Sequence, residues 1–227
     1  ATLASLGHKV VLFDRATQAG GTARETIPAE RLPIPILQRE VDAVFLPAQA
    51  IGKSDEHISF AGTLTLSPAT AIAAWVEIGR SLARAGVRRL VILNAHGGNV
   101  PVIDLVARTL RVEHHMLAVT CSMHRFGYPV GLFSDHERAH GIHGGEIETS
   151  LMLTFRPELV DMTHAGDSTP YSVAMEKEFA RLRANHPVGF GWLAEDLSAD
   201  GAMGDAREAT ALKGEAAAEY GARAFVE

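Results

Sequence analysis

The stretch SPATAIAAWVEIGRSLARAGVRRLVILNAHGGN, residues 67–99, decides the fold. Ser67 suits a helix N-cap and Pro68 suits the first helical turn, and apolar residues with helical spacing follow. Gly86 is a natural stop for that helix. The apolar, β-branched run 90–93 then predicts a buried strand. The stretch therefore predicts a helix, a tight turn and a strand that ends in a glycine-rich segment.

The residues that follow repeat this alternation. A second helix is expected from near Pro101 to about Val112, and a second strand from Met116 to Cys121. Alternating helices and strands predict an α/β fold, a three-layer sandwich with a mostly parallel central sheet and helices on both faces. Ligands of such sheets bind beyond the carboxyl ends of the strands, which is where His96 falls.

The remainder of the chain contains helices, loops and one segment of different character. Further helices are expected at residues 146–155, 173–184 and 206–225, with loops or irregular structure at 122–142, 161–171 and 186–206. Residues 1–44 contain a clear strand at Lys9–Phe13 followed by a proline-rich stretch. We therefore predict two parts, an atypical N-terminal segment 1–44 and a main domain 45–227.

Composition restricts the class of protein. With 227 residues, 47% hydrophobic residues and a net charge of −6, the chain is typical of a globular protein and is a poor match to a nucleic-acid binder. The apolar runs are too short to span a membrane, and no secretory signal is recognisable. Cys121 is the only cysteine, which excludes an intrachain disulfide. We therefore expect a cytoplasmic protein.

The segment Asn94-Ala95-His96-Gly97-Gly98-Asn99 is the first candidate site. A strand end holds the histidine rigidly, and imidazole is a good ligand for a zinc-like ion. The two glycines let the backbone approach a ligand and leave N–H groups free for an anion or carbonyl. The alternative is an ordinary glycine-rich turn with a surface histidine.

The segment His143-Gly144-Gly145-Glu146-Ile147-Glu148-Thr149-Ser150 is the second candidate site. His143 is suited to general acid–base catalysis because its pKa lies near working pH. Glu146 is grouped with it as a catalytic candidate, and Glu148 could bind a metal or orient a ligand. The alternative is that both carboxylates stabilise the first turn of a helix.

Two weaker candidates complete the set. Ser54-Asp55-Glu56-His57 carries three consecutive ionisable groups, which are more often a solvated loop than a site. Trp192, flanked by glycine, could line a substrate pocket or could simply pack in the core.

Three of these segments resemble signatures of one family, the creatininases. Residues 54–68 resemble its S-x-E-H…G-T-x-x-x-x-P segment, residues 94–99 its N-G-H-G-G-N signature with Ala95 in place of glycine, and residues 143–153 its H-[AG]-G-x-x-E-T-S-x-x-L signature. Their order and spacing agree with the family. The resemblance covers roughly residues 45–227.

The resemblance implies a function and a set of roles. The family hydrolyses C–N amide bonds, often of small cyclic or formylated amides, with a pair of divalent ions, commonly zinc or manganese. It implies that His96 is a metal ligand, that Glu148 is a ligand or lies beside the metals, and that His143 handles the proton of the leaving nitrogen. It also implies a homo-oligomer, often a hexamer. The residues assigned to substrate binding are Asn94, Gly97, Gly98, Asn99, His57 and Trp192.

The N-terminal segment departs from the family. The other metal ligands of the family lie in a segment of the form E-Q-H-G-P-H-L-P-x-x-x-D, and a forced alignment places Thr17 and Ala19 where its glutamate and histidine would stand. Residues 7–15, 20–21, 27–33 and 39–41 are instead similar to part of the dinucleotide-binding domain of flavin oxidoreductases of the glutamate-synthase small-subunit type.

Three hypotheses follow from the sequence. The first is a metal-dependent amidohydrolase, which should contain zinc or manganese. The second is a catalytically impaired or metal-poor protein with the creatininase fold. The third is a flavin or nicotinamide oxidoreductase, against which the absence of a phosphate-binding G-x-G-x-x-G loop counts.

Overall fold

The computed structural model describes residues 11–13, 44–185 and 187–227. These residues fall into two compact units that are discontinuous in sequence. Of the described residues, the first unit contains 11–13, 44–54, 64–126 and 224–227, and the second contains 55–63, 127–185 and 187–223. This division differs from the predicted boundary between residues 44 and 45. That boundary stays a prediction, because most of residues 1–44, including the pattern of glycines and prolines, lies outside the described residues.

Parallel strand pairs form the centre of the first unit. Strand β3 (Arg89–Asn94) pairs in parallel with β4 (Leu117–Ser122), and β1 (Val11–Phe13) pairs in parallel with β2 (Val44–Leu46). Strand β1 also lies close to β3. Parallel strands need a crossover, and α5 supplies it between β3 and β4. The expected parallel arrangement is therefore confirmed for the described strands of the first unit.

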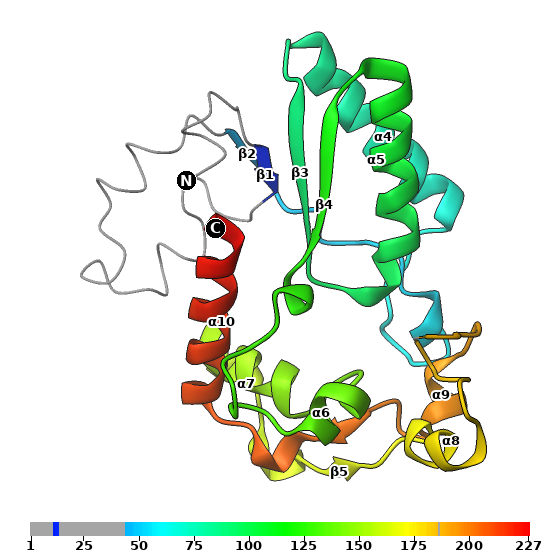
Figure 1. Ribbon diagram of the computed structural model, residues 1–227, viewed down its shortest axis with the longest axis vertical. Coiled ribbons are helices and arrows are strands. Elements are labelled where there is room, and N and C mark those ends of the chain that lie inside the picture. The colour runs from blue at the N-terminus through cyan, green and yellow to red at the C-terminus, as the bar shows by residue number, and fades with distance from the viewer. Residues whose placement is uncertain (1–10, 14–43, 186) are drawn as a thin grey trace. The chain divides into compact units, whose positions relative to one another are not determined.

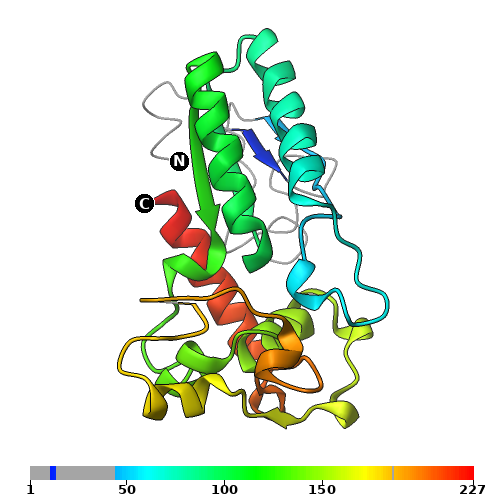
Figure 2. The same cartoon turned by 90° about the vertical axis from the view of Figure 1, so that its right-hand side faces the viewer.

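Helices α4 (Pro68–Arg84) and α5 (Val100–His114) cover one face of the β3–β4 pair (Figure 1). The side chain of Ser67 accepts a hydrogen bond from the Thr70 amide, and Gly86 has a φ of +89°, so both predicted helix boundaries are confirmed. The two helices run side by side in the turned view of Figure 2. A Cβ at Gly79 would lie 2.4 Å from Leu110 Cδ1, and this close contact explains the glycine in the middle of α4.

The core of the first unit lies between these two helices and the sheet. Its buried members are Ala71, Val76, Ala83, Leu90, Val102, Val106, Leu110 and Met116. Burial of this apolar surface is the main stabilising contribution, at roughly 25 cal/mol per Å² removed from water. It fixes the direction of β3, and therefore the place where the segment 94–99 begins.

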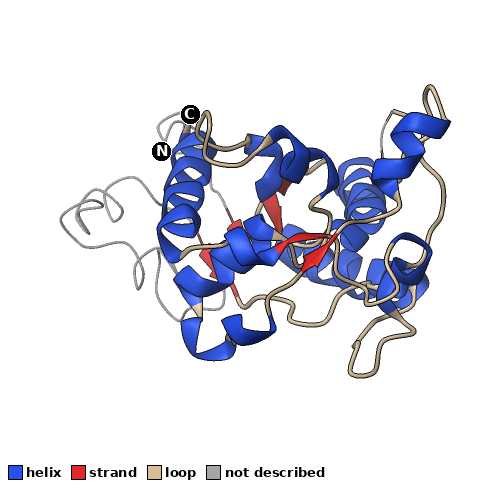
Figure 3. Ribbon diagram, turned by 90° about the horizontal axis from the view of Figure 1, so that it is seen from below, coloured by secondary structure: helices blue, strands red, loops and turns tan. Residues whose placement is uncertain are grey.

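Short helices joined by loops predominate in the second unit (Figure 3). Its helices are α6 (Asp135–His140), α7 (Glu146–Phe155), α8 (Ser172–Glu178), α9 (Ala194–Leu197) and most of α10 (Ala211–Val226). Strands β5 (Asp167–Ser168) and β6 (Gly204–Asp205) form a small antiparallel pair. Single-turn 3₁₀ helices occur in both units, at Asp55–His57, Gly97–Asn99, Met123–Phe126, Pro157–Leu159, Met162–His164 and Ala206–Glu208.

Helix α7 is the structural centre of the second unit. Ile147 packs with Phe133 and with Ala217 of α10 in one apolar cluster. A Cβ at Gly214 would lie 2.0 Å from the Ser150 carbonyl oxygen, so α10 crosses α7 in backbone contact. The predicted bounds of α7 are confirmed, whereas α8 ends at Glu178, earlier than the predicted 184. None of the described helices is long and apolar enough to cross a membrane.

Candidate functional site

A network of side-chain amides holds the segment 94–99 in the first unit. The Nδ2 of the buried Asn94 donates to the His96 carbonyl (2.8 Å) and to Ser122 Oγ (3.2 Å). Its Oδ1 accepts from the His96 amide (3.3 Å) and from Asn99 Nδ2 (3.2 Å). These four bonds use the full hydrogen-bonding capacity of an asparagine side chain. Asn94 therefore closes the turn after β3, and its predicted role in substrate binding stays a prediction.

Asn99 ties this turn to the loop before α4. Its Oδ1 accepts from the Lys53 amide at 2.8 Å, and a Cβ at Gly52 would lie 2.5 Å from the same oxygen. Gly52 therefore leaves room for the Asn99 side chain. The observed contacts of Asn99 are structural, and substrate binding by Asn99 stays a prediction.

His96 and Gly97 present a different environment. His96 is half-buried and extended (φ −138°, ψ 127°), and it directly precedes the 3₁₀ turn Gly97–Asn99 that also contains Gly98. Gly97 is exposed, and a Cβ placed on it would meet no atom within 4 Å. No described part of the chain therefore requires glycine at position 97, and the open space beside it is compatible with the predicted approach of a ligand.

His143 and Glu148 form a pair at the start of α7 in the second unit. The distance from His143 Nδ1 to Glu148 Oε2 is 3.4 Å, and the same oxygen accepts a hydrogen bond from the Gly144 amide at 2.8 Å. Hydrogen bonding to Glu148 raises the pKa of His143, against burial, which lowers it. Gly144 has a φ of +66°, a conformation that favours glycine and that lets the chain turn back towards Glu148.

A second histidine lies against this pair. The rings of His57 and His143 are 4.1 Å apart at their centroids and are tilted by 40°. His57 ends a 3₁₀ turn, and its carbonyl accepts a hydrogen bond from Thr63 Oγ1 at 2.9 Å. Two segments that the sequence analysis treated separately, around His57 and His143, therefore meet in the second unit.

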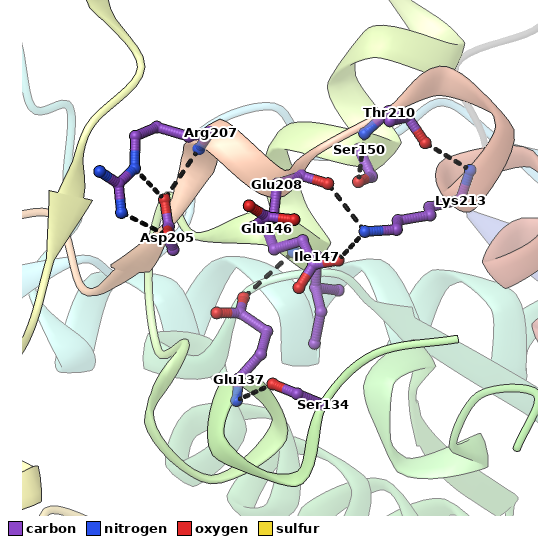
Figure 4. A network of polar contacts seen from close by, with 10 residues as sticks. All are labelled: Ser134, Glu137, Glu146, Ile147, Ser150, Asp205, Arg207, Glu208, Thr210 and Lys213. Carbon is purple, nitrogen blue, oxygen red and sulfur yellow. Dashed lines mark hydrogen bonds and ion pairs between the residues drawn. The ribbon is translucent and has the colours of Figure 1, made fainter. Parts of the chain in front are cut away.

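Glu146 makes a contact of another kind. It is buried and forms an ion pair with Lys213 of α10, whose Nζ also donates to the Glu208 carbonyl at 2.8 Å (Figure 4). Residues two apart on a helix do not share a face, so Glu146 and Glu148 serve different contacts. The ion pair fastens α7 to α10, and the predicted catalytic role of Glu146 stays a prediction.

Trp192 takes part in packing. Its indole Nε1 donates to the Ala184 carbonyl at 2.7 Å, and its ring packs against a buried cluster that includes Met175 and Leu197. This is the arrangement expected of a buried tryptophan with a satisfied polar atom. Its assignment to substrate binding stays a prediction.

Two buried ionisable residues of the second unit are not among the site residues predicted from the sequence. Glu137 is only 4% exposed and accepts a hydrogen bond from the Ile147 amide at 3.1 Å. His140 is 5% exposed, and its Nδ1 lies 2.9 Å from Ser172 Oγ. Both residues are in α6, which falls in the predicted loop 122–142. A signal was present, since Ser134 followed by Glu137 is a typical start of a helix.

The described residues do not by themselves fit a divalent metal. Among them, no group of three or more His, Cys, Asp or Glu side chains is placed to hold an ion. Of the predicted ligands, His96 belongs to the first unit and Glu148 to the second. A structural or catalytic metal normally takes at least three protein ligands, so a complete metal centre is not assembled from this part of the chain alone.

Comparisons with known proteins identify the family. A model of the creatininases, described as creatinine amidohydrolase, matches residues 16–227, and the chain therefore belongs to the creatininase family. The mycofactocin precursor peptide peptidase of Mycobacterium ulcerans is 32% identical over 74% of this chain and 58% of its own length. Creatinine amidohydrolase of Pseudomonas putida is 34% identical over 61% of each. The chain spans about six tenths of the length of these relatives.

Solved structures agree with the fold. A putative creatinine amidohydrolase from Bacteroides fragilis has a TM-score of 0.70 at 24% identity, covering 96% of this chain and 88% of that one. A manganese form of creatininase has a TM-score of 0.63 at 26% identity, covering 99% and 91%. The predicted creatininase-like α/β fold is thereby confirmed.

The predicted resemblance of residues 1–44 to a flavin oxidoreductase receives no support. The match to the creatininase family begins at residue 16, inside that segment. Short strand and turn patterns recur in many α/β proteins, which explains why a fragment without its phosphate-binding loop was misleading.

Proposed function

We propose that this chain hydrolyses a C–N amide bond, with His143 as the residue that handles the proton of the leaving nitrogen. The observation that supports the proposal is the contact of His143 Nδ1 with Glu148, whose carboxylate is itself held by the Gly144 amide. A histidine oriented by a carboxylate is suited to general acid–base catalysis.

In this proposal the two ring nitrogens of His143 have different roles: Nδ1 contacts Glu148, and Nε2 faces the substrate. Glu148 accepts at Nδ1 and so favours the proton on that nitrogen, which leaves Nε2 to exchange a proton with a substrate. When the ring is protonated, Nε2 can donate to the departing amine. The raised pKa of His143 favours this protonated form. The neighbouring ring of His57 restricts the orientation of the imidazole.

A divalent metal is part of the proposal because solved creatininases include manganese and dizinc forms. His96 and Glu148 would be ligands in this chain. When bound, the metal would supply an activated water and polarise the carbonyl of the substrate. Two residues are fewer than the three protein ligands that such an ion normally takes, and the metal content of the purified chain shows whether one or two ions bind.

The substrate that we propose is a small amide, cyclic or linear. One relative is a creatinine amidohydrolase and another is a peptide peptidase, and one solved creatininase is complexed with creatine. Hydrolysis of a peptide bond is therefore the second candidate. A homo-oligomer, a hexamer by resemblance to the family, and a cytoplasmic location stay predictions.

The competing proposal is a catalytically impaired or metal-poor member of the family. It is favoured by the departure of residues 14–21 from the ligand segment of the family and by the absence of a three-ligand cluster among the described residues. The two proposals differ in metal content, since only the hydrolase should bind zinc or manganese in stoichiometric amounts.

Elemental analysis of the purified chain is the first test, followed by assays with creatinine and short peptides in added Mn²⁺ or Zn²⁺. About two metal equivalents, as in two-metal hydrolases, together with amide cleavage would support the hydrolase. A metal content near zero and no cleavage would favour the impaired protein.

Two matched pairs of variants test the catalytic role of His143 and the metal-binding role of His96. His143→Ala should abolish cleavage, whereas His164→Ala should not, because His164 is exposed and paired with Asp161 in a 3₁₀ turn. His96→Ala should remove most of the metal, whereas His114→Ala, at the end of α5, should not. Equal metal content in the latter pair would overturn the assignment of His96.

A further inference from the structure

The start of helix α7 lacks a capping side chain of its own. Its N-cap is Gly145, and the first amide groups of a helix have no partner within the helix. A serine, threonine or aspartate usually supplies the missing acceptor at this position. The motif that carries His143 and Glu148 therefore needs an acceptor from elsewhere in the chain.

Glu137 of α6 supplies this acceptor. Its buried carboxylate accepts a hydrogen bond from the Ile147 amide at 3.1 Å (Figure 4). Burial raises the pKa of this carboxyl most, whereas hydrogen bonding by the backbone amides of Ile147, Asp205 and Glu146 lowers it. Two of these amides belong to the first turn of α7. The third belongs to β6, so one carboxylate joins α7 to a segment about sixty residues later in the chain.

Three glycines close around this carboxylate. A Cβ at Gly141 would lie 2.2 Å from Glu137 Oε1, one at Gly145 would lie 2.6 Å from the same oxygen, and one at Gly204 would lie 2.9 Å from Oε2. Such distances exclude a side chain at any of the three positions unless the carboxylate moves. The backbone therefore forms a closely fitting pocket for Glu137.

The same elements continue to His143. The amide of Met203, the residue before Gly204, donates to the His143 carbonyl at 2.7 Å, and the His143 amide lies 3.4 Å from the Met203 carbonyl. Glu137 itself is held by Ser134, whose Oγ accepts from the Glu137 amide at 3.0 Å. The backbone of His143 is thus held by Met203, whose neighbour Gly204 lies against the Glu137 carboxylate.

We propose that Glu137 is a positioning residue for the His143–Glu148 pair: it caps α7 from the side and sets the backbone that carries both side chains. The proposal deepens the proposed function and rests on it only where it assigns chemistry to His143. Glu137 would not touch the substrate, because its side chain is enclosed by backbone.

The test compares Glu137→Gln with two controls. Glutamine keeps the shape but replaces one acceptor oxygen with an NH₂ group that faces a backbone amide. Glu158→Gln changes an exposed carboxylate in the turn after α7, where Glu158 pairs with Arg156. Leu110→Ala removes a fully buried side chain of the first unit, from a cluster that contains no residue of the motif, and so reports the effect of lost stability alone.

The first readout is the ¹⁵N spectrum of the His143 imidazole at one fixed pH, assigned with His143→Ala. Glu137→Gln should shift both ring nitrogens, and both controls should leave them unchanged. Glu137→Asp, which keeps the charge on a shorter side chain, should give a smaller shift and serves if the glutamine variant does not fold.

The second readout is amide cleavage. We expect Glu137→Gln to lower kcat by about tenfold with KM within about twofold, because misorientation of an acid–base residue affects the chemical step. Unchanged His143 resonances and kcat in a variant that is merely less stable would overturn the proposal. If the parent protein cleaves no amide, the proposed function fails, and the ¹⁵N spectra still decide the positioning role.

Discussion

The strand-end segment 94–99 and the helix-start segment 143–150 look alike in sequence but are held in different ways. Each contains a histidine and a pair of glycines. Neutral amides of Asn94 and Asn99 hold the first, mostly through contacts within the segment. Carboxylates hold the second, through partners in α6, β6 and α10. The comparison teaches that similar motifs can differ in how much of the chain is needed to form them.

The largest effect is expected at the ion pair of the helix-start segment. Lys213→Met leaves the buried Glu146 carboxylate without its partner and should destabilise the protein by about 3 kcal/mol, near the lower end for a broken buried pair because Lys213 is partly exposed. Urea unfolding measures the change. The double variant Lys213→Met with Glu146→Leu should recover most of the loss. A double variant as unstable as the single one would contradict this account.

The second-largest loss of stability is expected at Gly145 of the helix-start segment. Gly145→Ala would bring a Cβ to 2.6 Å from Glu137 Oε1, 3.0 Å from Gly204 Cα and 3.1 Å from the Met203 carbonyl oxygen, and it should destabilise the protein by about 2 kcal/mol through overpacking. Thermal unfolding, monitored by circular dichroism, checks this. An unchanged melting temperature would mean that Glu137 does not occupy the pocket.

A smaller loss is expected at the strand-end segment. Asn94→Ala removes four hydrogen bonds but leaves groups that water can partly reach, so about 1 to 2 kcal/mol should be lost. Cys121 lies opposite Leu93 in the sheet register, next to this turn, and burial raises the pKa of its thiol. The native thiol should therefore alkylate slowly at neutral pH.

Labelling of Cys121 then measures local opening. Asn94→Ala should speed the alkylation at pH 7, and Lys213→Met, a change in the second unit, should speed it only through global unfolding. If the alkylation rate of Cys121 rises in both variants only as far as their loss of unfolding free energy accounts for, the strand-end segment has no local opening of its own.

The smallest effect is expected at Gly97. A Cβ there meets no atom, so Gly97→Ala should change stability by less than about 0.5 kcal/mol, in the stabilising direction if it reduces the freedom of the unfolded chain. If a substrate uses the open space, the same variant should raise KM. A large loss of stability at Gly97 would remove the contrast with Gly145.

The sequence predicted the first unit more completely than the second. The Ser67 cap, the Gly86 stop and the apolar strand 90–93 are local signals, and the structure confirms the elements that they indicate. The 135–140 segment DHERAH has no apolar stripe, so the sequence pattern predicts a loop where the structure has α6. The helix forms around the buried Glu137 carboxylate, whose pocket is completed by Gly204 from a distant part of the sequence, and no local pattern encodes that contact.

Local sequence patterns predicted the candidate site only in part, as they did the second unit. The motifs selected His96, His143 and Glu148, and the structure places His143, Glu148 and His57 together in the second unit. It also shows Glu146 in an ion pair with Lys213, a difference from Glu148 that the sequence of two carboxylates two residues apart does not reveal. The position of a residue on a helix face decides its partner, and that depends on which elements pack beside the helix.

The backbone contact between α7 and α10 also has a consequence for the time at which the protein folds during synthesis. Thr210 donates its amide to Ser150 Oγ, and these residues are 60 apart in the chain. At roughly 5 to 20 residues per second, a ribosome needs several seconds to make the interval. During that time the Glu146 and Glu137 carboxylates face water without Lys213 and Asp205. The helix-start segment is therefore completed late, when the last helix emerges, whereas the strand-end segment already has all its amide partners.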